Sequence, residues 1–287
     1  MGSNGRRRGS LTCSTLAPAT SVAVCARCPP VPSVAPVTGS RPVAWDAQGA
    51  VLFDLDGVLT PTAEVHMAAW ARMFGDLFAG LDTTRPDLRG ADTSAYTDAD
   101  YFAHVDGKPR YQGVADLLAA RGIRLPQGSP EDPPEALTVC GLGNRKNVAF
   151  TAILEREGVR PYPGSVALLD HLRGLGVPVA VVSSSANAPA VLAAAGLAER
   201  FDTVVDGRVA ADLGLAGKPQ PDTFLHAATA CGCAPERAVV VEDAVSGVRA
   251  GAAGGFGLVV GVDRGAGADA LRAAGADLVV ADLGELA

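Results

Sequence analysis

A short apolar run at residues 51–53 is followed at once by two carboxylates, Asp54 and Asp56, and by Gly57, which ends the extended segment. Side chains two residues apart on a strand point to the same side, so both carboxylates should face one small space. Two carboxylates held this close repel each other unless a divalent cation lies between them or one of them is protonated. The stretch therefore predicts an acidic site suited to phosphoryl transfer, and the alternative is a solvated Asp-Gly turn after an edge strand.

From residue 162 onward the chain alternates short apolar runs with helical periods. Strands are expected at 178–182, 203–205, 238–241, 257–260 and 277–280, and helices at 165–174, 189–195, 222–230 and 268–274. This alternation predicts an α/β fold with a parallel sheet and right-handed crossovers. Ser183 follows one of the strands, and Glu242 and Asp243 follow another. Because ligands bind at the carboxyl ends of parallel strands, these residues should lie close to Asp54 and Asp56.

The chemistry of these strand ends suits a transferred phosphoryl group. Such a group repels an anionic nucleophile unless a cation neutralises its charge, and Mg²⁺ prefers oxygen ligands. We expect Mg²⁺ to be held by the Asp54 carboxylate, the main-chain carbonyl of Asp56, the Asp243 carboxylate and, directly or through water, Glu242. Lys218 should balance the charge of the nucleophile and the phosphate. Ser183 and nearby backbone N–H groups should hold the phosphate oxygens.

Between these segments lies a mainly helical stretch broken by loops. A helical period covers 62–78, where His66 and Trp70 lie four residues apart on one face. Gly107, Lys108 and Arg110 form a cationic turn that can hold a phosphate, and a solvated charge pair is the alternative. A second cationic turn is expected at 141–147, before a helix at 148–157.

Composition narrows the classes of partner and compartment. The chain of 287 residues is 48% hydrophobic, which allows a sizeable core, and its net charge of −7 argues against a nucleic-acid partner. No long uninterrupted apolar run predicts a membrane span, so we expect a cytoplasmic protein with no membrane partner. Residues 1–48 carry five arginines and a single acidic residue without any structural period. We expect this segment to be a disordered leader.

Four motifs in order resemble those of the haloacid-dehalogenase superfamily of phosphotransferases. They are Asp54-Leu55-Asp56-Gly57-Val58, the strand end at Ser183, Lys218-Pro219, and Glu242-Asp243. Over residues 50–287 the chain is similar to the β-phosphoglucomutase group of that superfamily. The resemblance implies a Rossmann-like parallel-sheet core at 49–62 and 159–287, with a helical cap at 63–158 inserted after the first strand.

The resemblance also implies roles for individual residues. Asp54 becomes the nucleophile and Asp56 the general acid and base, while Thr62 and His66 match the hinge positions. Lys218 completes the expected catalytic set. The expected phosphate- or substrate-binding residues are Trp70, Gly107, Lys108, Arg110, Ser183, Ser184, Ser185 and Asn187. Lys108 would stand in for a lysine that precedes the matching glycine in other members.

Several positions depart from the family pattern. Pro61 occupies a position that is usually acidic, Ala186 replaces a common lysine, and Ala244 replaces a common serine. The cap is also longer than usual around residues 124–145, which the family pattern does not explain. With these departures, the resemblance implies phosphoryl transfer more directly than it implies which sugar is bound.

The expected function is therefore an isomerase. It would interconvert β-glucose 1-phosphate and glucose 6-phosphate through an aspartyl-phosphate and a bisphosphate, acting as a monomer on a small sugar phosphate. The alternative is a sugar-phosphate or small-metabolite phosphatase of the same fold, in which water replaces the second sugar hydroxyl. A third class, a non-catalytic binding relative, is disfavoured by the intact set of Asp54, Asp56, Lys218 and Asp243.

Overall fold

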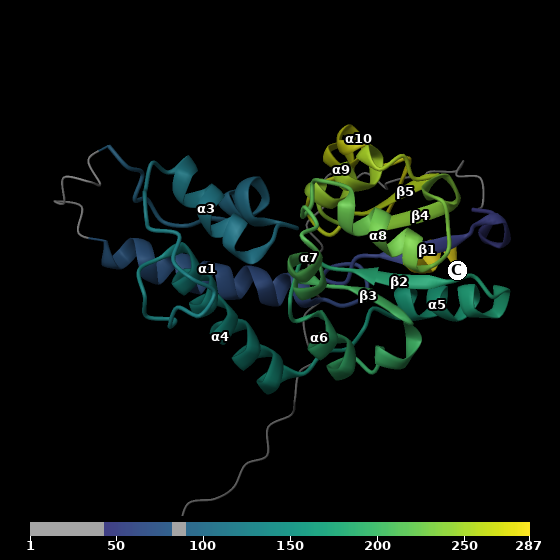
Figure 1. Cartoon of the computed structure of the whole chain (residues 1–287), viewed down its shortest axis with the longest axis horizontal. Helices are drawn as coiled ribbons and strands as arrows, with labels where there is room; N and C mark the ends of the chain where they lie inside the picture. Colours follow the sequence, from purple (N-terminus) through teal and green to yellow (C-terminus); the bar gives the residue numbers. More distant parts are fainter. Residues whose placement is uncertain (1–42, 82–89) are drawn as a thin grey trace, which may run out of the picture. The chain divides into compact units, whose positions relative to one another are not determined.

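The computed structural model of the protein describes residues 43–81 and 90–287, which form an α/β core and a helical cap (Figure 1). The core is built on a six-stranded parallel sheet with the strand order β3-β2-β1-β4-β5-β6. Its strands are β1 (Ala50–Phe53), β2 (Val179–Val182), β3 (Thr203–Val205), β4 (Ala238–Glu242), β5 (Leu258–Val262) and β6 (Leu278–Val280). The predicted α/β class with a Rossmann-like parallel sheet is confirmed.

Helices cover both faces of this sheet because successive strand side chains point to opposite sides. The core helices are α5 (Pro163–Leu175), α6 (Ala188–Ala194), α7 (Gly207–Leu213), α8 (Asp222–Ala230), α9 (Val245–Ala253) and α10 (Ala268–Ala274). Val51 and Phe53 of β1 join the apolar cluster of α5 and α6. Leu52, between them, joins the cluster of α8, α9 and α10 on the other face. Strand β1 is thus buried on both faces, and its carboxyl end is where a ligand can approach it.

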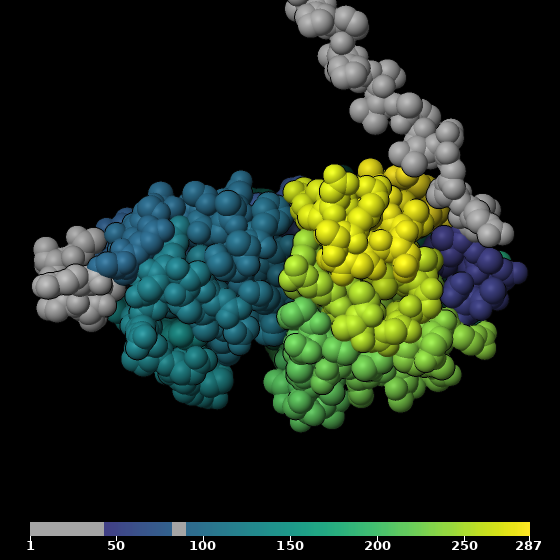
Figure 2. Space-filling view, turned by 90° about the horizontal axis from the view of Figure 1, so that it is seen from above, coloured from purple at the N-terminus to yellow at the C-terminus, as the bar shows by residue number. Residues whose placement is uncertain are grey.

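The cap lies between β1 and α5 in the chain and has an apolar core of its own. Its helices are α1 (Thr62–Gly80), α2 (Asp98–Asp100), a π-helix (Tyr101–Val105), α3 (Arg110–Ala120) and α4 (Val139–Glu157). Phe74 of α1, Leu117 of α3 and Leu142 of α4 are fully buried in this cluster. In the space-filling view, the blue to teal surface of the cap meets the green to yellow surface of the core (Figure 2).

Helix α4 begins earlier than the sequence predicts, and the cationic turn expected at 141–147 lies inside it. Thr138 caps the helix, because its side chain accepts a hydrogen bond of 2.9 Å from the backbone N–H of Gly141. The glycines that suggest a turn are there for close packing instead. A Cβ on Gly143 would lie 2.7 Å from the ring of Tyr111. Two short core helices, α7 and α9, are also absent from the sequence-based expectations.

The expected boundary of the leader at residue 48 is wrong. Trp45 stands in a short 3₁₀ helix (Trp45–Ala47) and is only 4% exposed, packed in the cluster of α5 and α6. Its indole N–H donates a hydrogen bond of 2.8 Å to the carbonyl of Leu286. The core therefore begins before Trp45, and the rest of the leader prediction, residues 1–42, lies outside the described residues.

None of the helices in the described ranges is long and apolar enough to cross a membrane.

Candidate active site

The two carboxylates that follow β1 face one cavity. Asp54 and Asp56 line a cavity of about 360 Å³, whose walls come from both the core and the cap. Leu55 between them is fully buried in the apolar core. Both carboxylates thus face the cavity as the sequence predicts, although β1 already ends at Phe53 and the backbone bends at Leu55.

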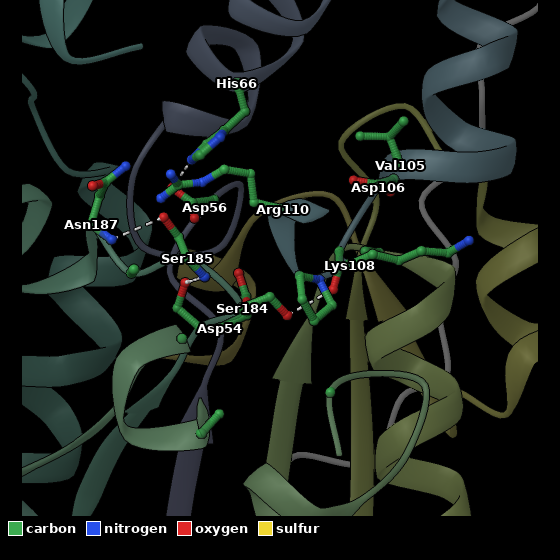
Figure 3. A pocket seen from close by; sticks show the side chains of 18 of the residues that line it. Asp54, Asp56, His66, Val105, Asp106, Lys108, Arg110, Ser184, Ser185 and Asn187 are labelled. Atoms are coloured by element: carbon green, nitrogen blue, oxygen red, sulfur yellow. Dashed lines mark hydrogen bonds and ion pairs between the residues drawn. The ribbon is translucent and has the colours of Figure 1, made fainter. Parts of the chain in front are cut away.

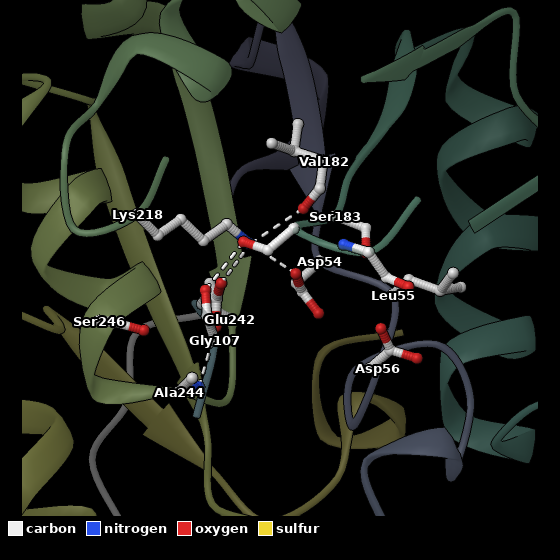
Figure 4. A network of polar contacts seen from close by, with 12 residues as sticks. Asp54, Leu55, Asp56, Gly107, Val182, Ser183, Lys218, Glu242, Ala244 and Ser246 are labelled. Atoms are coloured by element: carbon white, nitrogen blue, oxygen red, sulfur yellow. Dashed lines mark hydrogen bonds and ion pairs between the residues drawn. The ribbon is translucent and has the colours of Figure 1, made fainter. Parts of the chain in front are cut away.

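A buried ammonium group holds the first of these carboxylates in place. Lys218 Nζ donates hydrogen bonds to the carboxylate of Asp54, to Glu242 Oε1 at 2.6 Å and to the carbonyl of Val182 at 2.9 Å (Figure 4). Lys218 is 3% exposed, and the charges of both carboxylates outweigh burial and raise its pKa above the ordinary value. The ammonium group is thus charged and fixed beside the Asp54 carboxylate.

Glu242, which the sequence analysis expects at the metal site directly or through water, lines the cavity and has both of its oxygens hydrogen-bonded within the protein. One of its oxygens accepts the bond from Lys218, and the other accepts a hydrogen bond of 2.9 Å from the backbone N–H of Ala244. The side chain is 1% exposed and is packed against Gly247, where a Cβ would clash with it. Both oxygens are occupied, so Glu242 orients Lys218 and the start of the loop that carries Asp243.

The remaining oxygen atoms fit a small divalent cation. Burial raises the pKa of Asp54 to about 8, although the charge of Lys218 opposes this. Burial and the charge of Glu242 also raise the pKa of Asp243 well above its ordinary range. Asp54, Glu242 and Asp243 share the single positive charge of Lys218, and a divalent cation would supply the charge that is still missing. Asp243 fits against the first loop only because residue 57 is glycine, since a Cβ there would lie 1.9 Å from Asp243 Oδ2.

The donors available here are two carboxylates and the main-chain carbonyl of Asp56, which suit the oxygen preference of Mg²⁺. Within residues 43–81 and 90–287 no three histidine, cysteine, aspartate or glutamate side chains are arranged to hold a metal ion. A site at this place would therefore have to use the main-chain oxygen and water as well.

The second carboxylate, Asp56, is held by the first turn of cap helix α1. The hydroxyl of Thr62 donates a hydrogen bond to Asp56 Oδ1, and His66 Nε2 lies 3.5 Å from the same oxygen. Burial would raise the pKa of Asp56, but the contacts with His66 and Thr62 outweigh it and lower this pKa below its ordinary value. Asp54 and Asp56 thus have pKa values shifted in opposite directions, which is the pattern of groups with different catalytic roles.

Lys146 is a residue of the site that the sequence analysis missed. It projects from α4 with 3% of its surface exposed, and its ammonium group contacts His66 Nδ1. It also lies 4.9 Å from the ring centre of Trp70 and 4.9 Å from that of Phe150. Burial lowers the pKa of Lys146 to about 7. The sequence holds one indication of this position: if α4 is continuous, Lys146 lies on the same helix face as Phe150, four residues later.

Trp70, expected to contact substrate, has a ring that is largely enclosed. It is 4% exposed and stacks on Phe74 with 5.5 Å between ring centres. One edge of it reaches the cavity wall beside His66. Its main contribution is therefore to form the apolar floor under Lys146.

Polar groups gather at one end of the cavity, where the loop after β2 meets the cap. Arg110, Ser185 and Asn187 all line it, as Figure 3 shows. The side-chain N–H of Asn187 donates a hydrogen bond of 2.6 Å to Asn147 of α4, and Arg110 Nη1 donates one of 3.3 Å to Asn144. The core loop after β2 and the cap helices thus meet around this end. It offers a guanidinium group, a hydroxyl and an amide to an anion.

Two expected phosphate ligands are engaged elsewhere. The ammonium group of Lys108 lies 2.6 Å from Asp116 of α3 and extends away from Asp54 and Asp56 (Figure 3). That Lys108 stands in for the family lysine stays a prediction, because Lys108 lines the cavity but its ammonium group is paired with Asp116. The hydroxyl of Ser184 donates to the carbonyl of Gly107 at 2.8 Å instead of facing a phosphate. Ser183 remains buried at the strand end, where its Oγ accepts a hydrogen bond from the N–H of Ser185.

Comparison with known proteins agrees with this geometry. A family model for haloacid dehalogenase-like hydrolases matches residues 49–255. A β-phosphoglucomutase from Mycobacterium tuberculosis is 47% identical over 241 residues, which cover 83% of this chain and 90% of that protein. Hexitol phosphatase A from Escherichia coli is 30% identical over 211 residues, covering 71% of this chain and 78% of that protein.

Among solved structures, a β-phosphoglucomutase from Clostridium difficile has a TM-score of 0.65 to this chain at 23% identity, covering 84% of this chain and 93% of that one. At that identity the likeness concerns the fold. The family model and the mycobacterial relative extend it to the family, since both span most of the chain. The chain belongs to the haloacid dehalogenase superfamily, in its β-phosphoglucomutase-like group.

Proposed function

We propose that the protein is a β-phosphoglucomutase that interconverts β-D-glucose 1-phosphate and glucose 6-phosphate. One observation carries the proposal: Asp54 from the core and Arg110 from the cap line the same cavity, so that a reactive end and a second anion-binding end share one space. A mutase needs both ends, because its intermediate carries two phosphates. The similarity to the mycobacterial enzyme supports glucose as the sugar.

In the first half of the proposed reaction, the enzyme carries a phosphoryl group on Asp54. The 6-hydroxyl of β-glucose 1-phosphate gives its proton to Asp56, and its oxygen forms a bond to phosphorus as the bond to the Asp54 carboxylate breaks. The product of this step is glucose 1,6-bisphosphate. Thr62 and His66 hold Asp56 at the position from which it takes the proton.

In the second half, the bisphosphate turns end to end. The Asp54 carboxylate attacks the phosphorus of the 1-phosphate, Asp56 returns its proton to the departing sugar oxygen, and glucose 6-phosphate leaves. Lys218 stays hydrogen-bonded to the Asp54 carboxylate and offsets its charge. Arg110, Ser185 and Asn187 bind the phosphate that is not being transferred in each half.

The same end of the sheet supports a metal requirement. We propose that Mg²⁺ binds to the carboxylates of Asp54 and Asp243 and to the main-chain carbonyl of Asp56. When bound, it supplies the positive charge that lets an anionic oxygen approach a phosphate. Glu242 would take part only through its hydrogen bond to Lys218.

A phosphatase acting on a sugar phosphate is the second candidate. It is favoured by the similarity to hexitol phosphatase A, and its core residues would be the same. The two functions are separated by following glucose 6-phosphate and free phosphate together, with β-glucose 1-phosphate, Mg²⁺ and a trace of glucose 1,6-bisphosphate. Glucose 6-phosphate without matching phosphate would support the mutase, whereas phosphate alone would overturn it.

A further inference from the structure

Two serines of the core hold a turn of the cap, residues 106–109, which we call the cap turn. The hydroxyl of Ser184 donates to the carbonyl of Gly107 at 2.8 Å, and the hydroxyl of Ser246 donates to the carbonyl of Asp106 at 3.0 Å. The two serines come from different core segments, the loop after β2 and the first turn of α9. Asp106 and Gly107, which are consecutive in the cap, are therefore each held by a hydroxyl from a different core segment.

A third core segment touches the same cap turn. A Cβ on Gly217 would lie 2.5 Å from Cγ of Pro109, so the backbone of Gly217 is in direct contact with the proline ring. All three core segments carry a site residue close by in the chain, namely Ser183, Lys218 and Asp243. The cap turn therefore contacts every core segment after β1 that contributes to the reactive end.

The cap turn leaves no spare room against the core. Gly107 has φ +67°, and a Cβ there would lie 2.2 Å from Ser246 Oγ and 3.0 Å from the Cβ of Ala244. Helix α3 begins with Arg110 directly after the turn. The position of the cap turn against Ser246 therefore also determines the position of Arg110 in the cavity.

Ser246 has no place in the reactive cavity itself. It lines a separate cavity of about 890 Å³, which shares Asp106 and Pro109 with the cavity of Asp54. Ser246 thus lies behind the cap turn as seen from Asp54. Its hydroxyl can act on the reaction only through the position of the cap.

We propose that Ser246 is a positioning residue whose hydrogen bond to the cap turn decides whether a sugar hydroxyl or water receives the phosphoryl group. This inference rests on the proposed mutase function. A closed cap excludes water from phospho-Asp54, and an open cap admits it. The hydrogen bond of Ser246 joins the core to the cap and would break if the cap moved away, so it favours the closed arrangement, and its loss increases the time during which water can attack.

The test is the variant Ser246→Ala, which removes the donor and adds no bulk. Free phosphate released per glucose 6-phosphate formed should rise about three- to tenfold, the effect of losing one neutral hydrogen bond. The matched control is Thr229→Ala, because Thr229 also donates its hydroxyl to a backbone carbonyl, that of Leu225, but at an exposed position of helix α8 in the core. A purely structural loss would lower both products in parallel and leave their ratio unchanged.

A second measurement does not depend on the reaction. Amide hydrogen exchange of a peptide spanning the cap turn should be faster in Ser246→Ala than in the wild type or in Thr229→Ala, with exchange in the core strands unchanged. If both the product ratio and this exchange equal those of the control, the proposal is overturned. If the wild type forms phosphate but no glucose 6-phosphate, the mutase function fails, and the exchange comparison still shows whether Ser246 holds the cap.

Discussion

The imidazole Nε2 of His66 lies 3.5 Å from the carboxylate of Asp56, although the two residues belong to different parts of the molecule. His66 comes from α1 of the cap, and Asp56 follows β1 of the core. The other nitrogen of His66 contacts the ammonium group of Lys146. When Lys146 is protonated it can only donate, so His66 Nδ1 then accepts from it and the imidazole proton lies on Nε2, on the side of Asp56. Asp56, the proposed acid and base, is thus positioned by His66 of α1, which is itself in contact with Lys146 of α4.

Replacing His66 with alanine should slow isomerisation more than it slows phosphorylation of the enzyme. Asp56 must protonate the sugar oxygen, and without His66 it loses a partner that orients it, which should cost at least about tenfold in kcat. Acetyl phosphate has a leaving group that needs no proton, so the rate of Asp54 phosphorylation from acetyl phosphate should change much less. Equal losses in both assays would contradict this role.

The buried charge of Lys146 should make stability depend on pH. Burial lowers the pKa of Lys146 from 10.5 to about 7, so between these values the unfolded chain binds more protons than the folded one. The free energy of unfolding therefore rises with pH across this window. Lys146→Met should be more stable than the wild type near pH 7 and lose that advantage as pH approaches 10.5. Urea unfolding across the window checks this, and a difference that does not vary with pH would contradict it.

Binding of Mg²⁺ should release a proton and strengthen with pH. Burial raises the pKa of Asp54 to about 8 in the cation-free protein, so below that pH a cation must displace a proton. The raised pKa also means that cation-free stability falls as pH rises from 3.8 toward 8. The gain in Tm on adding Mg²⁺ should be larger above pH 8 than at pH 6, and Asp54→Asn should show a weaker dependence. A gain that shrinks with rising pH would refute the assignment.

Two glycines of the cap allow a matched comparison of closure. Gly107 and Gly158 have nearly the same φ, +67° and +68°, but a Cβ on Gly107 would strike Ser246 whereas one on Gly158 would meet nothing within 4 Å. Alanine at either position should cost about 1–2 kcal/mol of stability through backbone strain. Only Gly107→Ala should also abolish most of the isomerisation. Kinetics with thermal unfolding separates the two effects, and similar kinetic losses in both variants would disprove the close fit.

Removing the guanidinium group of Arg110 should affect substrates with two charged ends most. Arg110→Ala loses a charge-assisted contact with the distal phosphate, which should lower kcat/KM for isomerisation about 10- to 100-fold. Phosphorylation of Asp54 by acetyl phosphate, which carries one phosphate, should change little. Arg110→Lys should restore only part of the loss, because an ammonium group cannot make the same paired contacts. Full activity of Arg110→Ala would show that Arg110 does not bind a second phosphate.

The strand ends could be predicted because their signals are local. Asp54 and Ser183 each follow a short apolar run bounded by turn residues, and parallel strands bring such ends together. The predicted bounds of helix α8 and helix α10 match the structure for the same reason, since each has a clear period and a clear end.

The rest depended on packing between segments that are distant in the chain. Gly141 and Gly143 have low helix propensity, so the sequence suggests a turn. They nevertheless lie in α4, where glycine is needed because a larger side chain would clash with neighbouring residues. Without that helix, the position of Lys146 beside His66 has no visible signal. The orientation of Glu242 toward Lys218 also depends on a buried contact that no local pattern encodes.

Both serine contacts with the cap turn end on main-chain oxygens, those of Asp106 and Gly107. These two hydrogen bonds therefore do not involve the side chains of the cap turn, although residue 107 must be glycine to avoid a clash with Ser246. Substitution of the Lys108 side chain would therefore leave both acceptor oxygens in place, whereas a side chain at residue 107 would displace Ser246.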